Sequence, residues 1–294
     1  MIQILLIGKG GQLGWELQRT LAVLGEVYAI GYPEIDIERT GPLRELVRNA
    51  RPQIIVNAAA YTAVDEAESE QPRAWRVNAD APALLAEEAR RLKAICIHYS
   101  TGYVFDGQKG TPYVETDPPH PINSYGGSKL EGERRIQEVD DAYIILRTGW
   151  LYGLRREGGF VNKVLGWARR SEKLRVVKDQ VGSPTWSRML AEATAMMIAR
   201  SGEQFYDFLK SRRGTYHLAG RGASSRLQWA RKILHYDPHP EEQRAKKVDS
   251  ALSSEFPTLA ARPAYSALAC DRFEQTFDLR LPGWEDSLRL AMQE

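Results

Sequence analysis

Short apolar runs alternate with amphipathic segments through the first half of the chain. The runs have the length and apolar character of strands buried on both faces: IQILLI near Ile2, EVYAI near Val27, QIIVNAA near Ile54, AICIHYS near Ile95 and AYIILRT near Ile144. The segments after Gln12, Thr40, Ala79 and Ser124 carry apolar residues at three- and four-residue spacings, which predicts helices. Strands that alternate with helices are typical of an α/β fold with a doubly wound parallel sheet.

The pattern loosens beyond Trp150 into loops rich in glycine and arginine. A helix-like stretch at 188–199 and a strand-like TYHLA near Tyr216 interrupt these loops. We interpret 1–149 as a Rossmann-type, NADP(H)-binding domain that is completed by about 185–218. The ranges 150–184 and 219–294 then form a smaller C-terminal substrate-binding domain. Because no low-complexity linker separates the two parts, we expect them to pack closely with the ligand between them.

Composition excludes several classes of protein. The 294 residues carry a formal net charge of +2 without a lysine- or arginine-rich run, so nucleic-acid binding has no support. No apolar run approaches the length of a membrane span, and the start of the chain reads as a buried strand rather than a signal peptide. Cys96 and Cys270 lie far apart in sequence, which argues against a disulfide scaffold. We expect a cytoplasmic protein without a membrane partner, either a monomer or a weak homodimer.

A glycine-rich turn follows the first strand and opens the next helix. In GKGGQLG, glycines without a β-carbon allow a sharp turn and let a pyrophosphate approach the backbone N–H groups. The helix dipole at that point also favours an anion. A glycine-rich surface turn is the alternative, but the strand before and the helix after favour dinucleotide binding. The cofactor residues predicted here are Gly8, Lys9, Gly11, Gln12, Leu13 and Gly14.

The end of the second strand bears on the choice of cofactor. NAD-selective sheets carry an acid there that binds the ribose 2′-hydroxyl, but this chain has Gly31 and Tyr32. Glu34 and Asp36 are the first acids, and Lys9 or Arg39 could attract a 2′-phosphate. The sequence favours NADPH, with NADH left open.

Tyr125 and Lys129 lie four residues apart, so on a helix their side chains emerge from one face. A ketone that accepts a hydride also needs a proton, and a nearby ammonium would make a phenol a better donor. A lone Y-x-x-x-K pattern often occurs by chance, but here it follows Ser100 and Thr101 at the end of a predicted strand, where ligands bind in open α/β sheets. His98 lies within that strand and reads as a core residue.

With these motifs in place, the chain resembles the dTDP-4-dehydrorhamnose reductases over essentially its whole length. The resemblance rests on blocks in the family's order: GQLGWELQR from Gly11, VNAAAYTAVDEAE from Val56, HYSTGYVFDG from His98, YGGSKLEGE from Tyr125, LRTGWLYG from Leu146, DQVGSPTW from Asp179 and ARPAYSAL from Ala261. Together these blocks are far more specific than any single motif.

The resemblance implies roles for individual residues. Thr101, Tyr125 and Lys129 form the catalytic set, with Tyr125 as the proton donor and Lys129 also holding the nicotinamide ribose. Further cofactor contacts are implied for Asp36, Ile37, Ala58, Ala59, Ala60 and Ser100. Contacts with the sugar or its nucleotide are implied for Thr62, Val64, Thr101, Tyr103, Tyr125 and Trp150. Trp150 and Tyr103 could instead be plain core aromatics, and Arg262 is either a phosphate ligand or a solvated arginine.

Two departures from the family pattern stand out. Gly102 replaces an aspartate beside the catalytic threonine, and we expect this loss to impair the enzyme and Gly102→Asp to raise its efficiency. Some relatives bridge a dimer through a metal held by carboxylates, and Arg188 occupies the position that matches one of them. Arginine cannot ligate a cation, so we expect no metal.

These observations predict an NADPH-dependent reductase of the C4 ketone of a dTDP-linked 4-keto-6-deoxysugar, with dTDP-L-rhamnose as the product. One alternative is the reductase of another nucleotide-linked 4-keto-6-deoxysugar. Another is a non-catalytic NADP-binding subunit, like the regulatory partner of methionine adenosyltransferase; Tyr125 and Lys129 argue for the enzyme and Gly102 for the binder.

Overall fold

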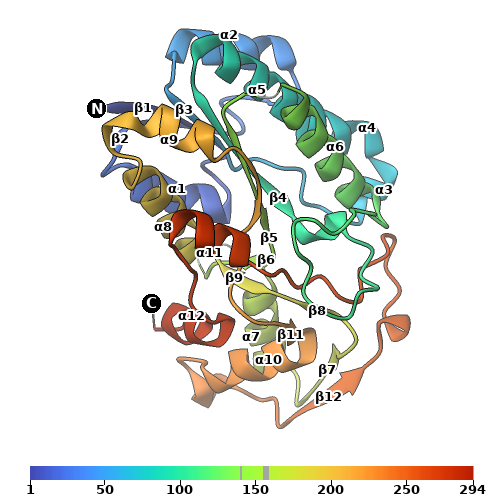
Figure 1. The fold of residues 1–294 in the computed structure, drawn as a ribbon. Coiled ribbons are helices and arrows are strands. Elements are labelled where there is room, and N and C mark those ends of the chain that lie inside the picture. The colour runs from blue at the N-terminus through green and yellow to red at the C-terminus, as the bar shows by residue number, and fades with distance from the viewer. Residues whose placement is uncertain (140, 155–158, 294) are drawn as a thin grey trace.

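A six-stranded parallel sheet forms the centre of the computed structural model, which describes residues 1–139, 141–154 and 159–293 (Figure 1). The strand order is β10-β5-β4-β3-β1-β2. The strands are β1 (Ile2–Ile7), β2 (Gly25–Ile30), β3 (Ile54–Asn57), β4 (Ile95–Thr101), β5 (Tyr143–Thr148) and β10 (Gly214–His217). The predicted strands of the first half and the strand near Tyr216 are thus confirmed. The apolar side chains of β1, β3 and β4 are buried, as a doubly covered sheet requires.

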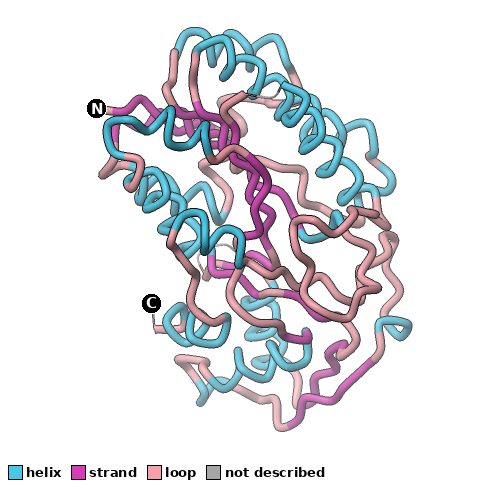
Figure 2. Tube along the Cα trace, in the orientation of Figure 1, coloured by secondary structure: helices cyan, strands magenta, loops and turns pink. Residues whose placement is uncertain are grey.

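Helices cover both faces of this sheet, and Figure 2 shows the strands running between the two helical layers. On one face lie α2 (Thr40–Ala50), α5 (Ala81–Leu92) and α6 (Ser124–Val139), which bury Leu43, Leu84 and Ile136 against it. The other face is covered by α1 (Gln12–Leu21), α8 (Ser187–Ala199), α9 (Phe205–Ser211) and α11 (Asp271–Phe277). The short helices α3 (Glu66–Ser69) and α4 (Gln71–Trp75) and a π-helical turn at Arg76–Asp80 connect β3 to α5.

A second region with its own aromatic core lies beyond the carboxyl edge of the sheet. It contains α7 (Phe160–Arg170), α10 (Arg226–His235) and α12 (Trp284–Ala291). Three two-stranded pairs accompany them: β6 (Trp150–Tyr152) with β9 (Pro184–Trp186), β7 (Lys173–Val177) with β12 (Lys247–Ala251), and β8 (Val181–Gly182) with β11 (Ser224–Ser225). The prediction of loops through most of the chain beyond Trp150 is wrong for α7, α9, α10, α11 and α12. The helices α9, α11 and α12 have only seven or eight residues, so their helical period is short, whereas α7 and α10 are as long as α2 and α1 and carry a period that the sequence analysis overlooked.

The strand order determines where a ligand can bind. From β1 the chain moves to β2 on one side, and β3, β4 and β5 follow on the other. In open α/β sheets the crevice at such a reversal, outside the carboxyl ends of the strands, binds the ligand. Within the described ranges no helix is both long and apolar enough to cross a membrane. Cys96 and Cys270 are buried and unbonded, so the prediction of no disulfide is confirmed for this pair.

Candidate active site

A cleft of about 870 Å³ opens at the carboxyl ends of the strands. It brings together nearly all the residues that the sequence predicts for the site, from the glycine-rich turn to Trp150. The predicted residues that line it are Gly8, Gly11, Gln12, Leu13, Asp36, Ile37, Ala58, Ala59, Ala60, Thr62, Val64, Ser100, Thr101, Tyr103, Tyr125, Lys129 and Trp150. Lys9 and Gly14 are the two predicted residues outside its lining.

The glycine-rich turn has no room for side chains at its ends. Gly8 has a φ of +96°, and a β-carbon there would lie 2.6 Å from the amide nitrogen of Ala59. A β-carbon on Gly14 would lie 2.0 Å from the carbonyl oxygen of Gly8. Gly14 therefore acts by letting α1 pack against the turn. Gln12 also lines the cleft, and its buried Oε1 has no partner among the described residues, as expected of a group that a bound dinucleotide would satisfy.

The end of the cleft near Asp36 and Ile37 is bordered by ion pairs. Glu38 accepts hydrogen bonds from Arg73 at 2.7 Å and from Arg76 at 3.1 Å, and these arginines lower its pKa although burial opposes them. At the rim, the Nζ atom of Lys9 lies 2.6 Å from Glu34 Oε1. Both partners are partly exposed, so the pair contributes little stability and Lys9 can exchange Glu34 for a phosphate at small cost. Arg39, the other cation considered for the 2′-phosphate, is exposed and does not line the cleft.

Tyr125 and Thr101 meet in the middle of the cleft. Tyr125 lies in the first turn of α6 and Thr101 ends β4, and their side chains share a hydrogen bond. Burial raises the pKa of Tyr125 to about 12; the Thr101 bond opposes this effect, and the neighbouring Tyr103 adds to it. The backbone N–H of Tyr103 donates to Thr101 Oγ1 at 3.1 Å, which fixes the threonine hydroxyl. The phenol therefore carries its proton at neutral pH and lies against an oriented hydroxyl.

Lys129 is 1% exposed, and its amine lies against strand β4. Its Nζ donates to the carbonyl oxygen of Tyr99 at 2.6 Å and lies 3.0 Å from Nε2 of His98. Burial lowers the pKa of Lys129 to about 7, while Glu133 opposes this. The spacing of Tyr125 and Lys129 predicted an ammonium close enough to favour the phenolate. That role stays a prediction; in this structure the amine is bonded to the Tyr99 carbonyl oxygen and lies beside His98.

His98 is fully buried, so its prediction as a core residue is confirmed. Asn57 Oδ1 accepts from the N–H of Ala59, which leaves the Asn57 amide group to donate to His98 Nδ1 at 3.1 Å. Nδ1 is then the acceptor of a neutral imidazole and Nε2 carries the proton. A protonated Nε2 facing Lys129 favours the uncharged amine, in agreement with its lowered pKa. Burial keeps the pKa of His98 well below its usual value.

Other residues of the cleft were not found from the sequence. Thr148 ends β5 directly opposite Thr101 in the strand register, and its buried Oγ1 has no partner among the described residues. The same edge argument that selected Thr101 would have selected it. Arg226 also lines the cleft and lies over Trp150, with 3.6 Å between the guanidinium carbon and the ring centroid. No motif marked this arginine.

Gly102 is buried in a 3₁₀ turn, Gly102–Val104, directly after Thr101. A β-carbon here would lie 2.9 Å from the carbonyl oxygen of Ser266 and 3.4 Å from the Leu268 side chain. The effect of an aspartate on activity stays a prediction, but this contact argues against an improvement, because the first carbon of the new side chain would meet a carbonyl oxygen. Arg262 was considered as a phosphate ligand or a solvated residue. It instead pairs with Asp65 at 2.7 Å and donates to the Ala260 carbonyl oxygen.

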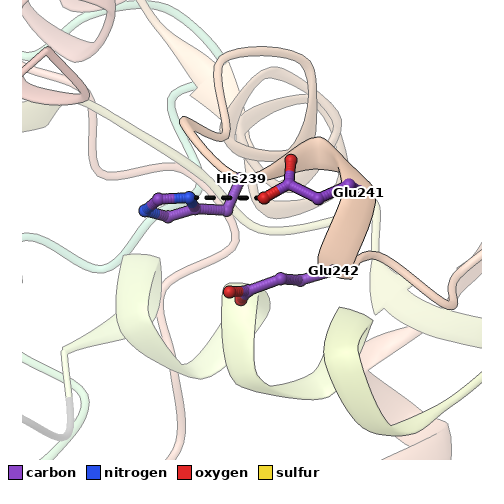
Figure 3. Close-up of side chains that lie close together, drawn as sticks. All are labelled: His239, Glu241 and Glu242. Atoms are coloured by element: carbon purple, nitrogen blue, oxygen red, sulfur yellow. Dashed lines mark ion pairs between the residues drawn. The ribbon is translucent and has the colours of Figure 1, made fainter.

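Arg188, at the position considered for a bridging metal ligand, lies on α8 with its Nε 3.6 Å from Glu16 Oε2. Elsewhere in the described part of the chain, His239, Glu241 and Glu242 form an exposed cluster with metal-ligating side chains (Figure 3). His239 lies 3.5 Å from Glu241, and Glu242 accepts a hydrogen bond from Arg169 at 2.5 Å. Because an arginine already neutralises Glu242, the cluster is weak evidence for a cation site, and the absence of a metal stays a prediction.

Comparison with known proteins agrees with this geometry. The family model described as "RmlD substrate binding domain" matches residues 2–294. The chain is 38% identical to a dTDP-4-dehydrorhamnose reductase of Burkholderia thailandensis, over all of this chain and 99% of the relative. It is 39% identical to one of Escherichia coli K12, over all of this chain and 98% of the relative.

Solved structures of such reductases superpose closely. The Clostridium acetobutylicum protein has a TM-score of 0.88 at 32% identity, over 99% of this chain and 98% of that one. The Bacillus anthracis protein, solved in complex with NADP, has a TM-score of 0.87 at 32% identity, over 99% of both chains. The match extends from the glycine turn to the end of the chain, and we conclude that this protein belongs to the dTDP-4-dehydrorhamnose reductase family.

Proposed function

We propose that this protein is an NADPH-dependent dTDP-4-dehydrorhamnose reductase, which reduces the C4 ketone of the nucleotide sugar to give dTDP-L-rhamnose. The observation that carries the proposal is the meeting of Thr101, Tyr125 and Lys129 in the cleft that the glycine turn opens. The full-length similarity to reductases of this name supports the choice of substrate.

The residues present fit a nicotinamide dinucleotide. The turn at Gly8 has no room for a side chain, Gln12 offers an unpaired buried oxygen, and Ala58 to Ala60 line the same cleft. Asp36 and Ile37 also line it and would contact the adenosine, and Lys129 would hold the ribose beside the nicotinamide. When bound there, the reduced nicotinamide supplies the hydride.

The chain's own residues supply the proton and the orientation. Thr101, fixed by the Tyr103 N–H, holds the substrate's carbonyl oxygen toward the phenol. Tyr125 transfers its proton to that oxygen as negative charge develops on it. The hydrogen bond from Thr101 then stabilises the phenolate, so Tyr125 gives up the proton more readily than a buried phenol alone would.

We also propose that the enzyme works in the cytoplasm as a monomer or weak homodimer. The buried free thiols of Cys96 and Cys270 support a reducing compartment.

The test is to incubate the protein with NADPH and dTDP-4-dehydrorhamnose, follow the absorbance of the reduced cofactor and identify the product by NMR. We expect stoichiometric NADPH oxidation and dTDP-L-rhamnose. Formation of the other C4 epimer would indicate a different reductase. Tight NADPH binding without turnover of this or related 4-keto-6-deoxysugars would favour the cofactor-binding subunit instead.

A further inference from the structure

Arg226 places a positive charge on the substrate side of the cleft. It is the first residue of α10, directly after the helix-capping Ser225, and its half-buried side chain lines the cleft. The guanidinium carbon lies 3.6 Å from the ring centroid of Trp150 and 4.7 Å from that of Phe160. Stacking on aromatic faces fixes the plane of the guanidinium and leaves its edge for hydrogen bonding.

Unlike Arg73, the other arginine that lines the cleft, Arg226 has no carboxylate partner among the described residues. Arg73 is paired with Glu38 and Glu70. The polar side chain that Arg226 does reach is the hydroxyl of Tyr103, to which it donates a hydrogen bond. Burial lowers the pKa of Arg226, the Tyr103 contacts oppose this, and the positive charge of Arg262 lowers it further. A desolvated cation beside a second cation is costly unless an anion joins them.

The position of Arg226 indicates which part of a ligand supplies that anion. Trp150 is only 8% exposed, and Arg226 lies over its ring, so the guanidinium is the charged group on this wall of the cleft. Tyr103 links Arg226 to the catalytic pair, since its ring lies edge-on to that of Tyr125 with centroids 6.1 Å apart. In a nucleotide sugar whose C4 faces Tyr125, the diphosphate on C1 lies one sugar ring away from the reacting carbonyl.

We propose that Arg226 binds the diphosphate of the nucleotide sugar, so that nucleoside diphosphates are held at this wall by a stacked guanidinium. A planar guanidinium with its edge free matches two phosphate oxygens and forms charge-assisted hydrogen bonds to them. This inference rests on the proposed function, which identifies the sugar nucleotide. The binding of a diphosphate at Arg226 is argued from the geometry of the cleft.

Calorimetric binding of thymidine, dTMP and dTDP to the whole protein tests the inference without any turnover. In the unaltered protein, affinity should rise from thymidine to dTDP and fall with salt. Arg226→Gln should weaken dTDP binding by on the order of ten- to a hundred-fold, the value of charged hydrogen bonds, and leave thymidine and NADPH binding unchanged. Arg226→Lys should retain more of the dTDP affinity.

Arg231→Gln is the matched control. Arg231 is an exposed residue of the same helix, and its one described hydrogen bond is to the Val248 carbonyl oxygen.

Kinetics supply a second readout: Arg226→Gln should raise KM for the nucleotide sugar with kcat nearly unchanged. The proposal is overturned if the unaltered protein binds dTDP no more tightly than thymidine, a result that does not depend on how the variants fold. It is also overturned if Arg226→Gln weakens thymidine as much as dTDP, or weakens NADPH instead. If the phosphate series holds but dTDP-4-dehydrorhamnose is not reduced, the proposed function fails while the diphosphate site stands.

Discussion

Within the active site, the hydrogen bond between Thr101 and Tyr125 opposes the effect of burial on the phenol. Burial alone would make Tyr125 a poor acid, because the charged phenolate is disfavoured in a water-poor cleft. The neighbouring hydroxyl stabilises that charge, and the Tyr103 N–H keeps the threonine in place. In this structure the groups that act on the Tyr125 phenol are therefore Thr101 and, through it, the Tyr103 N–H.

Tyr125→Phe should reduce turnover by about two to four orders of magnitude, the usual contribution of a general acid. NADPH affinity should change little, since the substitution deletes one oxygen and retains the buried ring. Steady-state kinetics and fluorescence titration with NADPH check both parts. Near-normal turnover in this variant would show that another group supplies the proton.

Gly102→Asp should lower kcat/KM and the stability of the protein. The new β-carbon would lie 2.9 Å from the Ser266 carbonyl oxygen, so the turn after Thr101 must shift, and misplacement of a reacting group by about an ångström can cost on the order of 100-fold. Gly102→Ala should show the steric part of this loss without the added charge. Equal or higher efficiency of the aspartate variant would mean that the turn relaxes easily and that the carboxylate is useful after all.

At the level of elements, the turn between β1 and α1 depends on close backbone contact. Gly14 belongs to the first turn of α1 and packs against the Gly8 carbonyl oxygen, which places the N–H groups of the turn at the cleft. Gly41, in the first turn of α2, has nothing within 4 Å of where a β-carbon would stand. A β-carbon would therefore clash with the backbone at Gly14, whereas at Gly41 it would meet no atom outside the neighbouring residues of the chain.

Gly14→Ala should destabilise the protein and weaken NADPH binding, because a β-carbon 2.0 Å from a backbone oxygen forces α1 away from the turn. Gly41→Ala should change stability little and leave NADPH binding unchanged, because the conformational entropy that alanine saves in a helix is offset by contact between its β-carbon and the ring of the following Pro42. Urea unfolding and NADPH titration of both variants test this pair. An unchanged Gly14→Ala protein would contradict the packing role of Gly14.

The sequence predicted the elements whose period was long and regular. The strands of the first half and helices α1, α2, α5 and α6 follow from their apolar spacing, and the same edge argument selected Thr101. The helices of the second region were missed because they do not alternate with strands: α12 has only eight residues, and α10, although as long as α1, packs on a cluster of tryptophans rather than on a sheet. Arg226 was missed because the aromatic rings that it stacks on, Trp150 and Phe160, lie in other elements of the chain. No local sequence pattern indicates such a contact.

For the molecule as a whole, buried polar networks tie α6 to the central sheet. Glu133 of α6 forms an ion pair with Arg147 of β5 at 2.6 Å and accepts a hydrogen bond from Ser100 of β4. Lys129, one turn earlier on α6, bonds to the backbone of β4 at Tyr99. Removing one partner of such a buried network leaves buried polar groups without hydrogen bonds and lowers the free energy of unfolding. Lys129 is thus part of the packing between helix and sheet, and its protonation is coupled to folding.

This coupling predicts a pH dependence of stability that belongs to Lys129. Its pKa is about 7 in the folded protein, whereas an unfolded lysine titrates near about 10.4. Between these values the unfolded chain binds a proton that the folded chain lacks, so the contribution of Lys129 to the free energy of unfolding rises with pH.

Lys129→Met removes this contribution. Urea unfolding of both proteins without cofactor, at pH values from about 7 to about 9, should therefore show the unaltered protein gaining stability relative to the variant as pH rises. The thiols and tyrosines titrate in both proteins, so their effects cancel in the difference. A stability difference that stays flat or falls with pH would mean that Lys129 remains charged in the folded protein, and the neutral amine inferred from the His98 tautomer would then be wrong.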